Sequence, residues 1–203
     1  MISLRMLVLG VSALGVASFA SASIIDFEGH PDDGAVTIVS NGFTFDFSAQ
    51  GWGVFTDGFS GGGAPYTHNG TTRLMMSGDR DGHTTQVLFK PTDDSAFSLQ
   101  QLDGATMFPE TAGGMEVIGN LEGGGTVSMS FDLSDSFNTF FLSGAFVNLD
   151  SVLVRNLVSG DFRNDSGVSL DNIVVNAPVP EPASIAAIGL GLAAFARRRR
   201  NKS

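Results

Sequence analysis

Residues 42–48 alternate aromatic and polar side chains with a period of two, and this pattern constrains the fold of the chain most. Because successive side chains of a strand point to opposite faces, the alternation is typical of a strand with one buried face. No segment of the body keeps helical spacing for three turns. Glycine, asparagine, aspartate or proline lies in nearly every gap and predicts turns, as at Asn69-Gly70 and Asp103-Gly104. The runs that we expect to form strands are 24–28, 42–48, 72–77, 86–90, 97–102, 114–118, 126–133, 139–142, 151–156 and 168–175.

About ten strands at short intervals predict an all-β fold, a single antiparallel β-sandwich or jelly roll. We expect phenylalanine to dominate its core, because the chain has 17 Phe but one Trp and one Tyr. The sequence has no cysteine, which excludes disulfides, thiolate metal sites and cysteine nucleophiles.

The N-terminus has the pattern of a secretory signal peptide. Arg5 precedes the twelve apolar residues 6–17, and Ala20-Ser21-Ala22 offers the small residues that a signal peptidase requires. Twelve residues are too few to span a bilayer. We therefore expect signal peptidase to remove residues 1–22 and residues 23–176 to form the sandwich domain; a buried N-terminal helix is the alternative.

The C-terminus, residues 177–203, has three parts. Three prolines keep residues 177–182 extended, residues 183–196 carry no charge, and a basic cluster ends the chain. A helix over residues 183–196 would be about 21 Å long, shorter than the hydrocarbon core of about 30 Å, but snorkelling arginines and local thinning reduce the mismatch. The basic cluster contains Arg197, Arg198, Arg199 and Arg200. Its positive charges predict that the C-terminal end lies in the cytoplasm.

The order of these parts resembles the PEP-CTERM sorting signal of Gram-negative bacteria. The matching residues are Val179, Pro180, Glu181 and Pro182, followed by the short helix and the arginines. The resemblance implies that the C-terminal helix holds the protein in the inner membrane, with the body in the periplasm. An exosortase-type protease then recognises the motif and passes the protein to the cell surface or the medium. An ordinary membrane anchor is the alternative. Such tails are also labelled as a C-terminal domain of ice-binding proteins, and that label by itself gives no reason to expect ice binding.

The charges between the two ends exclude one class of partner. Residues 23–180 hold 20 of the 21 acidic and five of the 11 basic side chains, so this segment carries a net charge of −15. An acidic body without a basic stripe repels phosphate, and we expect no nucleic-acid partner.

The body is also similar to jelly-roll carbohydrate-binding modules, through Phe27-Glu28 near its start and residues 170–173 near its end. In those modules, carboxylates of the first and last strands meet at a structural calcium ion. The resemblance assigns that role to Glu28 and Asp171, with Asp26 or Asn172 as neighbours, and calcium accepts such oxygen ligands. The alternative is that Asp26 and Asp171 face solvent or cap turns. No other cofactor is expected.

Two aromatic residues are candidates for sugar binding. Trp52 and Tyr66 flank the glycine-rich residues 51–63, and exposed rings there can stack on sugars, as in carbohydrate-binding modules. The alternative for Trp52 is a place in the core, since its ring buries a large apolar area.

No catalytic constellation emerges from the sequence. Residues 58–62 match the G-x-S-x-G pattern, but Pro65 follows where the motif requires a helix. Residues 79–82 and the pair Asp93-Asp94 are better explained as polar turns than as calcium loops. The three histidines, His30, His68 and His83, are too scattered for a zinc motif. The carboxylates are too many for the sequence to single out a glycosidase pair.

These observations favour a non-enzymatic exported protein of the cell surface or extracellular matrix, associated with exopolysaccharide. A calcium-supported carbohydrate-binding module is the first alternative, and a secreted hydrolase is the second.

Overall fold

The computed structural model describes residues 22–30, 37–47, 54–55, 67–77, 86–108, 113–157 and 167–176. Within them the chain forms twelve strands and no helix, so none of the described segments is a helix that could cross a membrane. Several predicted features lie outside the described residues: the predicted signal peptide up to Ser21, Trp52, Tyr66, the sorting motif at 179–182, the segment 183–196 and the arginine cluster.

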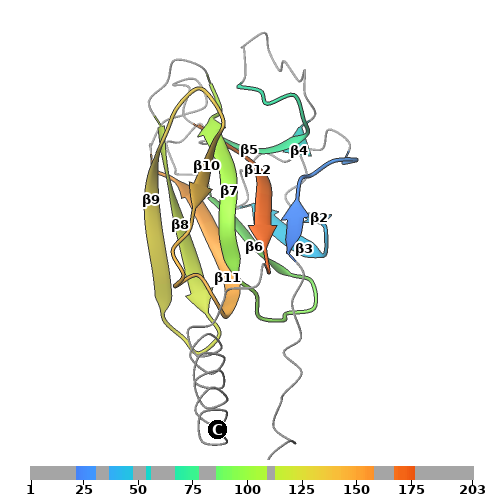
Figure 1. Ribbon diagram of the computed structural model, residues 1–203. Coiled ribbons are helices and arrows are strands. Elements are labelled where there is room, and N and C mark those ends of the chain that lie inside the picture. Colours follow the sequence, from blue (N-terminus) through green and yellow to red (C-terminus); the bar gives the residue numbers. More distant parts are fainter. Residues whose placement is uncertain are drawn as a thin grey trace, which may run out of the picture.

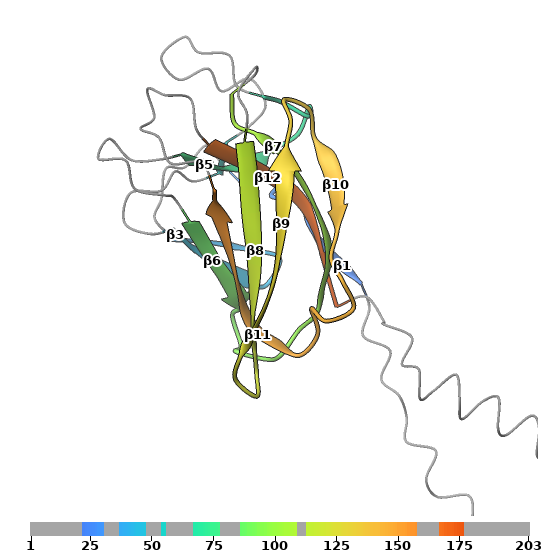
Figure 2. The same ribbon diagram turned by 90° about the vertical axis from the view of Figure 1, so that its left-hand side faces the viewer.

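The strands form two antiparallel sheets that face one another (Figures 1 and 2), which confirms the predicted β-sandwich. The first sheet, here the terminal sheet, has the order β10-β7-β12-β5-β4, with β1 also paired to β12. The second, here the opposite sheet, has the order β2-β3-β6-β11-β8-β9. The strands are β1 (Ser23–Ile25), β2 (Thr37–Ser40), β3 (Phe43–Phe47), β4 (Val54–Phe55), β5 (Arg73–Ser77), β6 (Gln86–Pro91), β7 (Leu99–Thr106), β8 (Gly113–Leu121), β9 (Thr126–Leu133), β10 (Asn138–Phe141), β11 (Leu149–Asn156) and β12 (Gly167–Val175).

Strand β12 organises the terminal sheet because it pairs with three other strands. One of its edges pairs with β7. On the other edge, Gly167–Leu170 pair with β5 and Ile173–Val175 pair with β1. The ends of β1 and β5 therefore meet beside Asp171 and Asn172, in the middle of β12.

Phenylalanine dominates the core between the sheets, as the composition predicts. Phe45 of β3 and Phe89 of β6 stack with ring centroids 5.2 Å apart, and both are fully buried. Phe27 and Phe45 pack edge to face with ring centroids 5.2 Å apart, and Phe97 and Phe43 do so with centroids 5.1 Å apart. Offset and edge-to-face contacts of this kind add to the hydrophobic gain of burying the rings.

Three details of the strand prediction are wrong. The first strand ends at Ile25 rather than at Glu28, because Phe27 has a φ of 56° and the chain turns at Glu28 and Gly29. The predicted turn at Asp103-Gly104 is the interior of β7, where a Cβ on Gly104 would lie 3.4 Å from the Met115 side chain. The sequence also missed the short strands β2 and β4.

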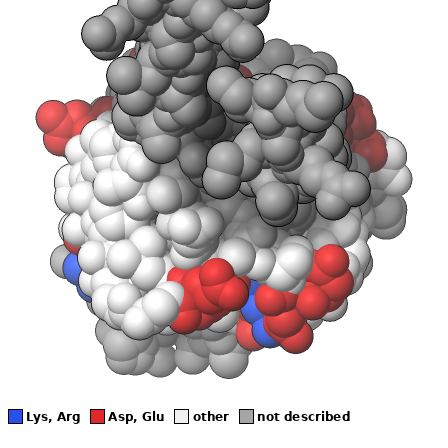
Figure 3. All heavy atoms as spheres, turned by 60° about the horizontal axis from the view of Figure 1, so that its bottom comes forward, with Lys and Arg blue, Asp and Glu red and all other residues white. Residues whose placement is uncertain are grey.

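The face of the molecule shown in Figure 3 has the acidic character that the sequence predicts. On the face shown in Figure 3, Asp and Glu side chains form several separate groups, and few Lys or Arg side chains lie among them.

Replacing Phe89 with alanine should lower the free energy of unfolding by about 3–5 kcal/mol, because it leaves a cavity in the core between the two sheets. Urea unfolding measures this change. The control is Val39→Thr at an exposed position of β2, which should change stability by no more than about 0.5 kcal/mol. Equal losses in the two variants would contradict the assigned core.

Candidate functional site

The last strand of the sandwich contains an extra residue at its centre. Asn172 has a φ of 47°, and the pairing of β12 with β7 shifts register between Asp171 and Val174. Asparagine tolerates this left-handed conformation better than most residues. The extra residue allows both Leu170 and Ile173 to face the core, although simple alternation would place residues three apart on opposite faces.

Asp171 lies at this bulge and is fully buried, although it is outside the apolar core cluster. Its Oδ2 atom accepts hydrogen bonds from Asn69 Nδ2 at 2.6 Å and Thr71 Oγ1 at 2.7 Å. Its Oδ1 atom accepts one from the backbone N–H of Asn172 at 2.8 Å. The alternative that Asp171 faces solvent is therefore wrong.

A second carboxylate lies opposite Asp171 on β7. Asp103 is its direct register partner. The Asp103 Oδ2 atom accepts a hydrogen bond from Asn172 Nδ2 at 2.9 Å, and its Oδ1 atom accepts one from Thr139 Oγ1 of β10 at 2.6 Å. Polar contacts thus run from the loop before β5, across β12 and β7, to β10.

Glu28 contacts the same loop. Its Oε1 atom accepts a hydrogen bond from the backbone N–H of Thr72 at 3.1 Å, next to the residues that bind Asp171. Asp26 Oδ1 accepts one from the Glu28 N–H at 3.2 Å. We call Asp26, Glu28, Asn69, Thr71, Thr72, Asp103, Asp171 and Asn172 the Asp171 junction.

The structure therefore brings Glu28 and Asp171 onto one segment, 69–72, and places Asn172 beside them. Asp26 caps the turn at Glu28, in line with the alternative given for it. The sequence did not nominate Asn69, Thr71 or Asp103. Asn69-Gly70 and Asp103-Gly104 have the composition of turns, and only the pairing of distant strands brings their side chains to Asp171.

Burial raises the pKa of the Asp171 carboxyl above its ordinary value. The hydrogen bonds from Thr71, Asn69 and the Asn172 backbone oppose this shift, and the charge of Asp103 adds to it. A buried carboxylate held mainly by uncharged donors would gain from a nearby cation.

The donor chemistry of the junction fits calcium in part. The carboxylates of Glu28 and Asp171 supply oxygen ligands of the kind that calcium prefers. However, Asp171 Oδ2 already accepts two hydrogen bonds, so Asn69 and Thr71 would have to rearrange around an ion. Among the residues that the structure describes, no three His, Cys, Asp or Glu side chains are grouped to hold a metal. The calcium site stays a prediction.

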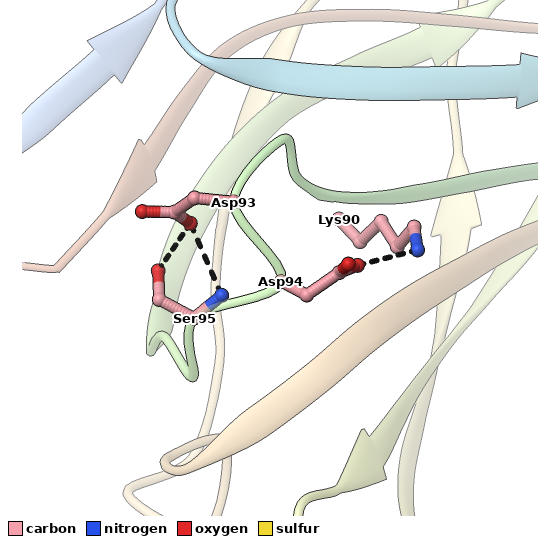
Figure 4. Close-up of polar contacts among 4 residues, drawn as sticks. All are labelled: Lys90, Asp93, Asp94 and Ser95. Atoms are coloured by element: carbon pink, nitrogen blue, oxygen red, sulfur yellow. Dashed lines mark hydrogen bonds and ion pairs between the residues drawn. The ribbon is translucent and has the colours of Figure 1, made fainter.

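The pair Asp93-Asp94 forms a polar turn, shown in Figure 4. Asp93 Oδ1 accepts hydrogen bonds from the N–H of Ser95 at 3.0 Å and its hydroxyl at 2.7 Å. Asp94 Oδ1 forms an ion pair with Lys90 Nζ at 2.6 Å. The Ser95 hydrogen bonds lower the pKa of Asp93.

Asp171→Asn should reveal the raised pKa through the pH dependence of stability, measured by urea unfolding in a chelator. The folded protein binds this proton more tightly than an unfolded aspartate of pKa about 3.9. The contribution of Asp171 is then full below about pH 3.9 and is lost as pH rises through the raised pKa. The free-energy difference between wild type and D171N should therefore shrink as pH rises.

Asp93→Asn is the matched control, because its pKa is shifted in the other direction. A lowered pKa gives stability above the unfolded value that is lost as pH falls. The difference between wild type and D93N should therefore grow as pH rises; the same trend in both variants would refute the role of burial at Asp171.

Comparison with known proteins identifies the tail. Residues 178–200 match the family model of the PEP-CTERM protein-sorting motif, which confirms that prediction. A search of curated proteins finds no match.

Solved structures that resemble the fold include a family 29 carbohydrate-binding module from Piromyces equi. It has 15% identity and a TM-score of 0.44, over 80% of this chain and 94% of that chain. The family 11 carbohydrate-binding module from Clostridium thermocellum, in complex with a mixed-linked tetrasaccharide, has 13% identity and a TM-score of 0.43, over 78% and 96%. Allantoicase also matches, with 16% identity and a TM-score of 0.38, over 66% and 39%. The twelve described strands form an all-β sandwich, and the chain carries a PEP-CTERM sorting motif.

Proposed function

We propose that the protein is an exported, non-enzymatic component of the cell surface or extracellular matrix, sorted through its tail and associated with exopolysaccharide. The PEP-CTERM motif at residues 178–200 carries this proposal. The position of the motif supports it, because β12 ends at Val175 and all twelve described strands precede the motif. Cleavage at the motif would therefore leave the sandwich intact.

The partners follow from this route. Signal peptidase removes residues 1–22. The segment 183–196 anchors the protein in the inner membrane while the body lies in the periplasm. An exosortase-type protease then processes the chain near Pro182. The charge of −15 on residues 23–180 keeps the released body soluble and disfavours a nucleic-acid partner.

Replacing Pro180, Glu181 and Pro182 together with alanine should block processing in the exporting bacterium. The variant should stay in the inner-membrane fraction with an intact C-terminus. Wild type should end near Pro182 and be recovered with the exopolysaccharide. Cell fractionation and mass spectrometry of the termini measure both outcomes.

Lys202→Gln is the control, since residue 202 lies outside the matched segment, and it should be processed normally. Normal release of the triple variant would refute sorting by the motif, and so would a mature wild type that keeps residues 197–202.

The second candidate function is a calcium-supported carbohydrate-binding module. The convergence of Glu28 and Asp171 on residues 69–72 favours it, because calcium there would tie both terminal strands to the loop before β5. In this function Trp52 and Tyr66 would stack on sugar rings. A secreted hydrolase has no comparable support.

Calcium should raise the melting temperature of the wild-type protein relative to the same protein in chelator, because an ion that binds only the folded state stabilises it. Glu28→Gln should lose this difference, since it removes a charged ligand and keeps the shape of the side chain. Asp94→Asn, in the turn near β6, should keep it. An unchanged wild-type melting temperature would eliminate the calcium site.

A further inference from the structure

One edge of the opposite sheet is formed by the long strand β9. Within the described residues, β9 pairs only with β8, and the register of that pair continues without a shift from Thr126 to Leu133. Figure 1 shows β9 along the outer left side of the sandwich. The other strands at sheet edges are short: β1 has three residues, β2 four, β4 two and β10 four. With eight residues, β9 is the longest edge in the described part of the chain.

Lysine, proline and a bulge, which commonly protect edge strands, are absent from β9. Its sequence, TVSMSFDL, has no lysine and no proline, and Asp132 near one end is its only charge. Exposed and half-buried residues alternate along it, and only Leu133 is buried. An open edge of this kind offers unpaired backbone N–H and C=O groups to another strand.

The half-buried side chains of β9 lie on an incompletely covered side of the core. Val127, Met129 and Phe131 pack against the core from its margin. The ring of Phe131 packs against that of Phe140 of β10, with ring centroids 4.9 Å apart. The next residue, Phe141, is 69% exposed. A partner strand on β9 would extend the apolar face over this margin.

The sequence of β9 is complementary to itself. An antiparallel pair of two copies must be centred on one residue, because facing side chains lie on the same side of the sheet. Only two centres use nearly the whole strand, Met129 and Ser130. A centre at Met129 places Asp132 opposite Thr126, and a centre at Ser130 places it opposite Ser128.

In both registers, apolar side chains face apolar ones and Asp132 never faces another carboxylate. Like charges directly opposite would destabilise the pair. We infer that β9 is a homodimer interface, at which two copies pair edge to edge and join their opposite sheets into one continuous sheet. This inference does not depend on the proposed function.

Single cysteines test the pairing in the full chain, expressed in the exporting bacterium. The natural sequence has no cysteine, so any disulfide comes from the introduced residue. A disulfide joins residues whose Cα atoms are about 4.4–6.8 Å apart. Only a residue on the two-fold axis of the dimer faces its own copy at that separation. Met129→Cys or Ser130→Cys should therefore yield a disulfide-linked dimer, and Thr126→Cys and the matched exposed control Thr37→Cys on β2 should not.

Cross-linking at residues 129 and 130 no stronger than at Thr37 would overturn the inference. So would a cross-linked product whose mass shows a different protein on β9.

A charge variant provides the second test. Ser128→Asp with Ser130→Asp places like charges opposite one another in either register and should abolish the dimer in sedimentation of the purified protein. The control, Ile24→Asp with Val39→Asp, adds the same charge at exposed positions of β1 and β2 and should dimerise normally. Melting curves verify that both variants are folded.

Salt distinguishes strand pairing from ionic contacts. Two acidic bodies repel one another, so raising the salt concentration should tighten the wild-type dimer by screening that repulsion. A dimer that weakens in salt, or a monomer at every concentration, would contradict pairing through β9.

Discussion

The pairing of β12 with three other strands is the constraint on which the terminal sheet depends. Without β12, nothing would connect β5 and β1 to β7, and the sheet would separate into pieces. The extra residue at Asn172 makes this arrangement compatible with a single core, because it keeps Leu170 and Ile173 on the same face. It also sets Asp171 beside the point where β1 ends and β5 begins. The carboxylate binds the loop that leads into β5, so the polar contacts hold the neighbours of β12 in place.

The sequence predicted the sandwich because period-two alternation reports one buried face, and every predicted run contains at least part of a strand. It missed β2, whose only two apolar residues, Ile38 and Val39, point to opposite faces, and β4, which has two residues. It misread Gly104 because glycine after aspartate is typical of turns. In the fold, Gly104 lies in the interior of β7, where an added Cβ would contact the Met115 side chain of β8.

The site was predictable only where a family resemblance supplied it. The resemblance led to Glu28 and Asp171, which the fold brings to one segment of the chain. Asn69, Thr71 and Asp103 have no local signal, since their contact with Asp171 results from strand order and register. The tail shows the opposite case: its motif is contiguous, so its residues suffice to identify it.

The position of β12 also bears on when the protein can fold. The strand that holds β1, β5 and β7 together is made after all of them, immediately before the sorting motif. Pairing of the first strand with the last is a contact of the longest range, and such contacts form late. The terminal sheet therefore cannot close until the chain has been made as far as Val175. Topology alone thus places completion of the fold after synthesis of the whole body.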